Sequence, residues 1–276
     1  METPSAAVSG TMPVVYCIGD SHVCFFSGQD TIHPLWPHVT DDRLPWFKTH
    51  RIGASLAYNL SHEGTKTRGR ERLFEVLDTK VPAGAHVLLS FGEIDCRAHL
   101  VKQARIKGLP IGAVVDMCLN EYFKVVKEIA DRGFQVIVYN VVPSRVSMLG
   151  GAASRDDNKL VTSGTLLERN HAASLFNEGA RRRCATCGTR FLENFSRLVD
   201  GRGRTIRWFF WDSIHLSQRA MPVTLEALRM ICPEIGIPAQ LVKRPSVMEM
   251  AADEVRRRFD RIVKAVIKIP RIFGAS

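Results

Sequence analysis

Four strand-like apolar runs constrain the fold of this chain more than any other feature. They cover residues 14–18, 86–91, 134–142 and 206–211, and helix-like stretches follow at residues 112–132, 163–183 and 217–231. Alternation of strands and helices is typical of parallel β-α units, in which helices cover both faces of a sheet. The sequence therefore predicts an α/β fold.

Each apolar run ends in a polar or glycine-containing cluster. The clusters are GDSH at 19–22, GEIDCR at 92–97, NVVPSR at 140–145 and DSIH at 212–215. Because the carboxyl ends of parallel strands meet at one edge of a sheet, we expect the four clusters to converge there. Residues 27–50 show no clear period and are predicted to form an irregular loop near that edge, either a substrate wall or a packed surface loop.

Length and composition favour a cytoplasmic protein with a sizeable core. The chain has 276 residues, 45% of them hydrophobic, and lacks the run of about 18 apolar residues that a membrane span needs. Residues 1–13 have neither the basic start nor the apolar stretch of a secretory signal peptide. The seven cysteines are an odd number within mostly apolar stretches, which predicts reduced thiols rather than a disulfide scaffold.

The composition shifts at Pro233, which predicts a catalytic domain over 12–232 and an extension over 233–276. The extension is expected to be a linker followed by a basic amphipathic helix from Val247 to about Lys268. That helix either makes peripheral contact with an anionic membrane or packs on the main domain. The formal net charge is +10, but no nucleic-acid-binding motif is recognisable, so no nucleic acid partner is expected.

The first and last clusters carry the residue types of a nucleophilic catalytic site. Ser21 directly follows a strand, at a turn where backbone N–H groups can stabilise a developing oxyanion. Asp212 and His215 are three residues apart, so the carboxylate can accept a hydrogen bond from Nδ1–H while Nε2 faces outward. We predict that Ser21 is the nucleophile, His215 its general base and Asp212 the residue that orients His215. Asp20, in the same turn, is expected to bond to local backbone.

With these blocks the sequence resembles the SGNH or GDSL hydrolase family. The matching residues are Gly19-Asp20-Ser21 at the start and Asp212-Ser213-Ile214-His215 near the end, and Gly53 in RIGAS is similar to the second block. The resemblance implies a flavodoxin-like three-layer α/β/α sandwich with a short, parallel, five-stranded sheet. It also implies an oxyanion hole formed by the N–H groups of Ser21 and Gly53, and neither a metal nor an organic cofactor.

The third block departs from the family pattern at one residue. Gly92-Glu93-Ile94-Asp95 places isoleucine where the family has an asparagine whose amide donates to the oxyanion. Loss of one such donor costs about 3 kcal/mol of transition-state stabilisation. Asp95, Arg97 or the backbone of Cys96 can supply a substitute contact, or Arg97 forms a structural ion pair with Asp95 or Glu93.

Two further candidates are His22 and the cysteine pair Cys184 and Cys187. His22 adjoins the nucleophile and is a candidate for lining the acyl pocket. Cys184 and Cys187 form a single C-x-x-C pair, and because a structural zinc needs four ligands we predict no metal there.

The resemblance implies a serine esterase or O-acyltransferase acting on a small acyl ester, with a small molecule or glycan as substrate. The alternative is a non-catalytic protein of the same fold that binds a glycan or a protein partner, which the loss of the asparagine at Ile94 favours. A pure binding module needs none of Ser21, Asp212 and His215, and their presence favours the enzyme.

Overall fold

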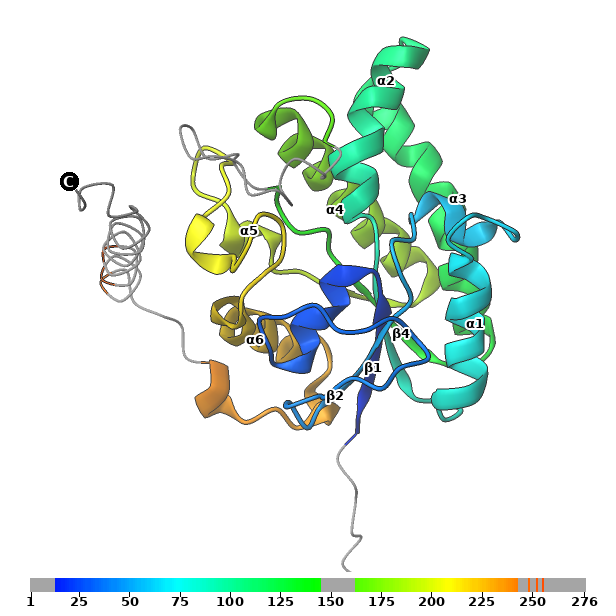
Figure 1. Ribbon diagram of the computed structural model, residues 1–276, viewed down its shortest axis with the longest axis vertical. Coiled ribbons are helices and arrows are strands. Elements are labelled where there is room, and N and C mark those ends of the chain that lie inside the picture. Colours follow the sequence, from blue (N-terminus) through cyan, green and yellow to red (C-terminus); the bar gives the residue numbers. More distant parts are fainter. Residues whose placement is uncertain (1–12, 145–161, 243–247, 249–251, 253–254, 256–276) are drawn as a thin grey trace, which may run out of the picture. The chain divides into compact units, whose positions relative to one another are not determined.

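Five parallel strands form a single sheet in the order β2-β1-β3-β4-β5 (Figure 1). The computed structural model describes residues 13–144 and 162–242, together with residues 248, 252 and 255. The strands are β1 (Val15–Gly19), β2 (Phe47–Arg51), β3 (His86–Ser90), β4 (Gln135–Tyr139) and β5 (Arg190–Leu192). The α-helices are α1 (Gly69–Lys80), α2 (Val101–Lys107), α3 (Ile111–Asp131), α4 (Leu166–Cys187), α5 (Phe195–Leu198) and α6 (Met221–Ile231).

Helices cover both faces of this sheet (Figure 1). Side chains of α1, α3 and α4 form one apolar cluster with strand residues that include Val138. On the other face, Phe26 of the 3-10 helix η1 (Ser21–Ser27) packs edge-on against Tyr139, with the ring centroids 5.0 Å apart. Asn194 joins α6 to that face, because its amide donates to both the Tyr139 hydroxyl and Thr224 of α6. The predicted three-layer α/β/α fold with a five-stranded parallel sheet is therefore confirmed.

The two edge strands are not recognisable in the sequence. β2 occupies the end of the stretch predicted as an irregular loop, with Phe47 and Thr49 buried and Lys48 exposed. Such a half-exposed edge strand lacks the continuous apolar run that marks a central parallel strand. β5 has only three residues, which is too short for a period to be recognised.

Residues 206–211 do not form a strand, which corrects the sequence prediction. Arg207–Phe209 is a 3-10 helix, and Phe210 makes only an isolated antiparallel bridge with Leu216. Phe209 and Phe210 are both buried, so the run is apolar because it contributes to the core. Periodicity alone does not distinguish a short buried turn from a strand.

The compact part of the chain reaches Val242, beyond the predicted boundary at residue 232. Residues 233–242, at the start of the predicted linker, contain two 3-10 helices, Pro233–Ile235 and Ala239–Val242, with Ile235 buried. The predicted C-terminal helix lies outside the described residues except at 248, 252 and 255, so its membrane contact stays a prediction. None of the helices described is long and apolar enough to cross a bilayer.

Gly19, the first residue of the Gly-Asp-Ser block, is required by close strand packing. A Cβ atom at this position would lie 2.4 Å from the Ser90 carbonyl oxygen of β3. We expect Gly19→Ala to lower the free energy of unfolding by about 3 kcal/mol, since the strands must separate to admit the methyl group. Urea denaturation measures this change. Gly112→Ala is the control, because no atom lies within 4 Å of its added Cβ and alanine is preferred in helix α3 by up to about 1 kcal/mol. Equal stability of Gly19→Ala and the wild type would contradict the close packing.

Candidate active site

Ser21 lies where β1 ends and the 3-10 helix η1 begins. β1 lies between β2 and β3, so the residues that follow these two strands flank Ser21 on either side. Asp20 caps η1, its carboxylate accepting a hydrogen bond from the His22 N–H at 2.8 Å, as expected for that turn. Because Ser21 is the first residue of η1, its own N–H has no acceptor within the helix.

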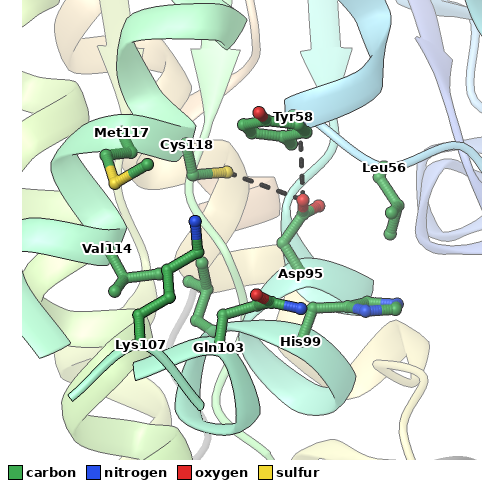
Figure 2. Close-up of a pocket in the computed structure, with 10 residues that line it drawn as sticks. Leu56, Tyr58, Asp95, His99, Gln103, Lys107, Val114, Met117 and Cys118 are labelled. Carbon is green, nitrogen blue, oxygen red and sulfur yellow. Dashed lines mark hydrogen bonds between the residues drawn. The ribbon is translucent and has the colours of Figure 1, made fainter. Parts of the chain in front are cut away.

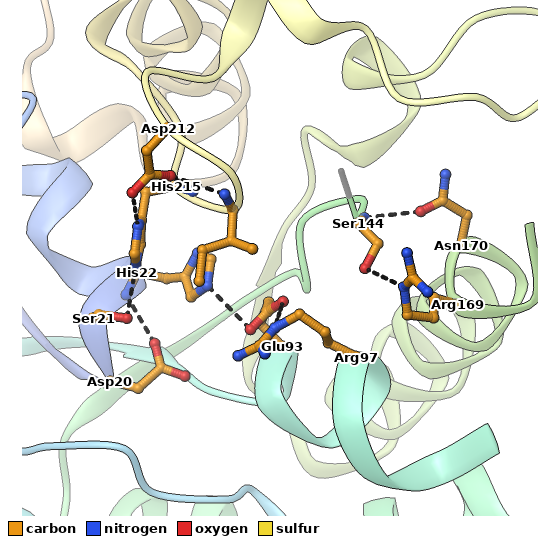
Figure 3. A network of polar contacts seen from close by, with 11 residues as sticks. Asp20, Ser21, His22, Glu93, Arg97, Ser144, Arg169, Asn170, Asp212 and His215 are labelled. Carbon is orange, nitrogen blue, oxygen red and sulfur yellow. Dashed lines mark hydrogen bonds and ion pairs between the residues drawn. The ribbon is translucent and has the colours of Figure 1, made fainter. Parts of the chain in front are cut away.

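Ser21, His215 and Asp212 form a continuous chain of hydrogen bonds (Figure 3). The Ser21 Oγ lies 2.8 Å from His215 Nε2, and His215 Nδ1 lies 2.6 Å from Asp212 Oδ2. The structure thus brings together the three residues that the sequence predicts as nucleophile, base and orienting acid, although Ser21 and His215 are 194 residues apart in the chain.

A tight turn fixes the orientation of Asp212 and His215. The other carboxylate oxygen of Asp212 accepts hydrogen bonds from the backbone N–H groups of Ile214 and His215, at 2.8 and 2.7 Å. Trp211 stacks on the His215 ring with the centroids 5.7 Å apart, and the Trp211 N–H donates to the His215 carbonyl. Both side chains are therefore held before a substrate binds.

The electrostatics of this chain suit a general base. Burial opposes the charge on Asp212, but hydrogen bonds from His215 and Ile214 outweigh it and hold the pKa of Asp212 below its ordinary value. Burial lowers the pKa of His215, and the neighbouring His22 adds to this effect, while Asp212 partly offsets it. At neutral pH His215 is therefore uncharged, with Nδ1–H donating to Asp212 and Nε2 accepting the Ser21 hydroxyl proton.

Gly53 follows β2 at the same sheet edge as Ser21. The Ile52 N–H donates to the Gly19 carbonyl at 2.9 Å, which extends the pairing of β2 and β1 up to the site. Gly53 has φ +107°, a conformation that favours glycine, and its N–H has no acceptor among the described residues. It can therefore donate to a ligand beside Ser21.

The hydrogen bonds of Asp95 join it to the loop after Gly53 and to α3. Its buried carboxylate accepts hydrogen bonds from the N–H groups of Ala57 and Tyr58, and from the Cys118 thiol at 3.5 Å. It faces a separate cavity of about 290 Å³ between the Tyr58 turn, α2 and α3 (Figure 2). Asp95 thus anchors the loop that carries Gly53.

Arg97 forms the ion pair that sequence reasoning offered as the structural alternative. Its Nε donates to Glu93 Oε1 at 2.7 Å, and both side chains are buried. The other carboxylate oxygen of Glu93 lies 3.2 Å from His22 Nε2. His22 therefore connects this pair to the triad, with its ring centroid 4.8 Å from that of His215 (Figure 3).

Sequence reasoning missed two contributors to the site. Glu93 was considered only as a partner of Arg97, and its contact with His22 depends on a strand neighbour that the sequence does not identify. The stacking of Trp211 on His215 was also missed, although the adjacency of Trp211 to the Asp212 block was a usable signal.

The third polar cluster, of which residues 140–144 are described, makes hydrogen bonds that join neighbouring structural elements. Ser144 N–H donates to Asn170 of α4 at 2.8 Å, and Arg169 Nε donates to the Ser144 hydroxyl (Figure 3). Asn140 accepts hydrogen bonds from the backbone at Asn194 and so joins β4 to the residues after β5. Asn140, Val141 and Val142 of this cluster nevertheless line one pocket with Asp20, His22 and Glu93, so the third cluster also lies at the predicted sheet edge.

Among the described residues, no group of three or more His, Cys, Asp or Glu side chains could hold a metal ion. All seven cysteines are free thiols, including Cys184 and Cys187.

No family model matches the chain, and no curated protein matches it. Among solved structures it is similar to phospholipase A1 from Streptomyces albidoflavus, with 15% identity, 80% of this chain and 100% of the other covered, and a TM-score of 0.45. It is also similar to a GDSL-like lipase from Bacteroides thetaiotaomicron, with 12% identity, 83% of this chain and 92% of the other covered, and a TM-score of 0.42. The OSK domain of Drosophila Oskar is similar with 13% identity, 78% of this chain and 86% of the other covered, and a TM-score of 0.45.

The chain has a five-stranded, all-parallel α/β/α fold. This sheet is the one expected from the resemblance of the sequence blocks to SGNH or GDSL hydrolases. The solved structures named above have TM-scores under 0.5, and no activity or substrate is transferred from them to this chain.

Proposed function

We propose that this protein is a serine esterase or O-acyltransferase with Ser21 as nucleophile. One observation carries the proposal: the continuous hydrogen-bonded chain from Ser21 Oγ through His215 to Asp212 at the carboxyl edge of a parallel sheet. A neutral imidazole bonded to a serine hydroxyl on one side and to a carboxylate on the other is an arrangement built for proton transfer.

The proposed reaction proceeds through an acyl-enzyme. Ser21 Oγ attacks the ester carbonyl carbon as its proton moves to His215 Nε2, and the carbonyl electron pair becomes an oxyanion. The N–H groups of Ser21 and Gly53 donate to that oxyanion. Collapse expels the alcohol, which takes the proton from Nε2, and the acyl group stays on Ser21. Water, or an acceptor hydroxyl in a transferase, then attacks with His215 as base.

The proposed substrate class is a small acyl ester on a carbohydrate hydroxyl. This part of the proposal follows from the resemblance to SGNH or GDSL hydrolases rather than from the site geometry. The rival is a folded protein that binds a glycan or protein partner without catalysis, which the apolar Ile94 favours. The rival is supported if the purified protein binds a saccharide but hydrolyses neither acetylated sugars nor activated esters.

The pH dependence of ester hydrolysis tests the proposed base. We expect kcat/KM for p-nitrophenyl acetate to fall on the acid side with a midpoint below 6.5, because only the uncharged His215 accepts the Ser21 proton and its pKa is lowered. His33→Asn is the matched control: it removes another buried histidine with a lowered pKa, and the acid limb should remain. A midpoint above 6.5, or loss of the limb in the control, would show that His215 is not the titrating base.

A further inference from the structure

The apolar Ile94 leaves the β3 side of Ser21 without the amide donor that the asparagine would supply. Ser21 follows the strand between β2 and β3, so an oxyanion there is approached from two sides. On the β2 side Gly53 offers its N–H. On the β3 side, Asp95 is bonded to the Gly53 loop and Arg97 is bonded to Glu93.

His22 occupies this β3 side with one ring nitrogen at ion-pair distance from a carboxylate. Its side chain is 94% buried, since its relative exposure is 6%, and Glu93 Oε2 lies 3.2 Å from Nε2. The Glu93 carboxylate is itself held by Arg97 at 2.7 Å. The backbone N–H of His22 is bonded to Asp20, so both ends of the residue are anchored.

The remaining ring nitrogen of His22 is uncommitted. Nδ1 has no hydrogen-bond partner among the described residues, and the ring lies 4.8 Å from the ring of His215, whose Nε2 contacts Ser21 Oγ. A buried imidazole with one nitrogen held by a carboxylate and the other unpaired presents a single directed donor when it is protonated.

The charges around His22 favour its protonated form. Burial opposes the charge, but the carboxylates of Glu93 and Asp20 outweigh both burial and the repulsion from Arg97, so the pKa of His22 is raised. The Glu93 pKa is held at about 2: burial opposes its charge, but His22 and Arg97 outweigh burial. His215, a further titratable neighbour, has a lowered pKa because of burial and stays uncharged at rest. Tyr139 lines the same pocket as His22, and burial raises its pKa, so it stays neutral as well.

We propose that His22, held by the Glu93–Arg97 pair, donates its Nδ1–H to the substrate oxyanion in place of the missing asparagine amide. The donor binds the carbonyl oxygen as negative charge develops on it and keeps its proton throughout, so the Ser21-to-His215 proton path is unchanged. Glu93 and Arg97 are positioning residues, because they act only through His22. This inference rests on the proposed esterase function.

The test compares pH profiles of kcat and kcat/KM for p-nitrophenyl acetate hydrolysis. In the wild type, kcat and kcat/KM are expected to fall on the alkaline side with a midpoint above pH 6.5, where His22 loses its proton. This alkaline limb comes in addition to the acid limb of His215. His22→Ala should lower kcat about 100-fold with little change in KM, and the alkaline limb should disappear. Glu93→Gln should move that limb to lower pH, since the neutral amide no longer favours the His22 cation.

His86→Asn is the matched control for these variants. It removes a second His–Glu pair, His86 with Glu234 at 2.9 Å, at the opposite end of β3, and both limbs should persist. A His22→Ala enzyme with kcat within about threefold of the wild type, or with the alkaline limb intact, overturns the proposal. If His22→Ala does not fold, the Glu93→Gln variant decides: an alkaline limb at the same pH as in the wild type overturns the proposal.

Failure of this inference is distinguishable from failure of the esterase proposal. Ser21→Ala is measured in the same assay. If Ser21→Ala is inactive while His22→Ala is unaffected, only the role of His22 is wrong. If Ser21→Ala retains wild-type turnover, the esterase proposal fails and the role of His22 fails with it.

Discussion

Replacing Ser21 with alanine is expected to lower kcat for p-nitrophenyl acetate by about 10⁴-fold or more. The methyl group cannot attack the ester, and no other hydroxyl of the described residues is hydrogen-bonded to the Nε2 atom of His215. Initial-rate kinetics at neutral pH measure the loss, and circular dichroism establishes that the variant is folded. The loss should appear in kcat and kcat/KM together, since the covalent step is removed.

Ser61→Ala is the control for this variant. Ser61 also lies on a 3-10 helix, Tyr58–Ser61, but its hydroxyl donates to Glu121 rather than to a catalytic base. We expect its turnover to match the wild type. An initial burst of p-nitrophenol that persists in Ser21→Ala would mean that another residue is acylated.

Replacing Asp212 with asparagine is expected to lower kcat by about 10³- to 10⁴-fold. The amide keeps an oxygen to accept the N–H groups of Ile214 and His215, so the turn is retained. The negative charge that faces Nδ1 of His215 is lost, however, and an amide NH₂ on that side stabilises the tautomer with the proton on Nε2. That tautomer cannot accept the Ser21 proton.

The same assay with Asp200→Asn provides the comparison. Asp200 also caps a surface turn through backbone N–H groups, those of Arg202 and Arg204, and it contacts no member of the triad. We expect this variant to retain wild-type kcat. If Asp212→Asn instead stayed within about tenfold of the wild type, the carboxylate would not be orienting the base.

The sequence predicts the central part of the fold because buried parallel strands leave an unambiguous signal. β1, β3 and β4 are continuous apolar runs, and each ends in polar residues. The edge strand β2 and the three-residue β5 lack that signal, since an edge strand exposes part of its surface and a short one shows no period. The run at 206–211 gave the opposite error, because burial of Phe209 and Phe210 in a turn produces the same apolar composition.

The candidate site was predictable where residue identity alone carries the chemistry. Ser21, Asp212 and His215 are recognised by type and spacing, and they meet as predicted. The role of Asp95 was not predictable, because its partners Ala57 and Cys118 come from other elements. The contact of His22 with Glu93 likewise depends on the pairing of β1 with β3, which only the assembled sheet defines.

Covalent labelling tests the central claim most directly. The protein is incubated with a fluorophosphonate, which traps an activated serine hydroxyl, and the modified peptide is identified by mass spectrometry. We predict one adduct per chain, on Ser21, absent from Ser21→Ala and slowed in Asp212→Asn. No adduct on a folded protein, or an adduct on a different residue, would contradict the assignment of Ser21 as the nucleophile.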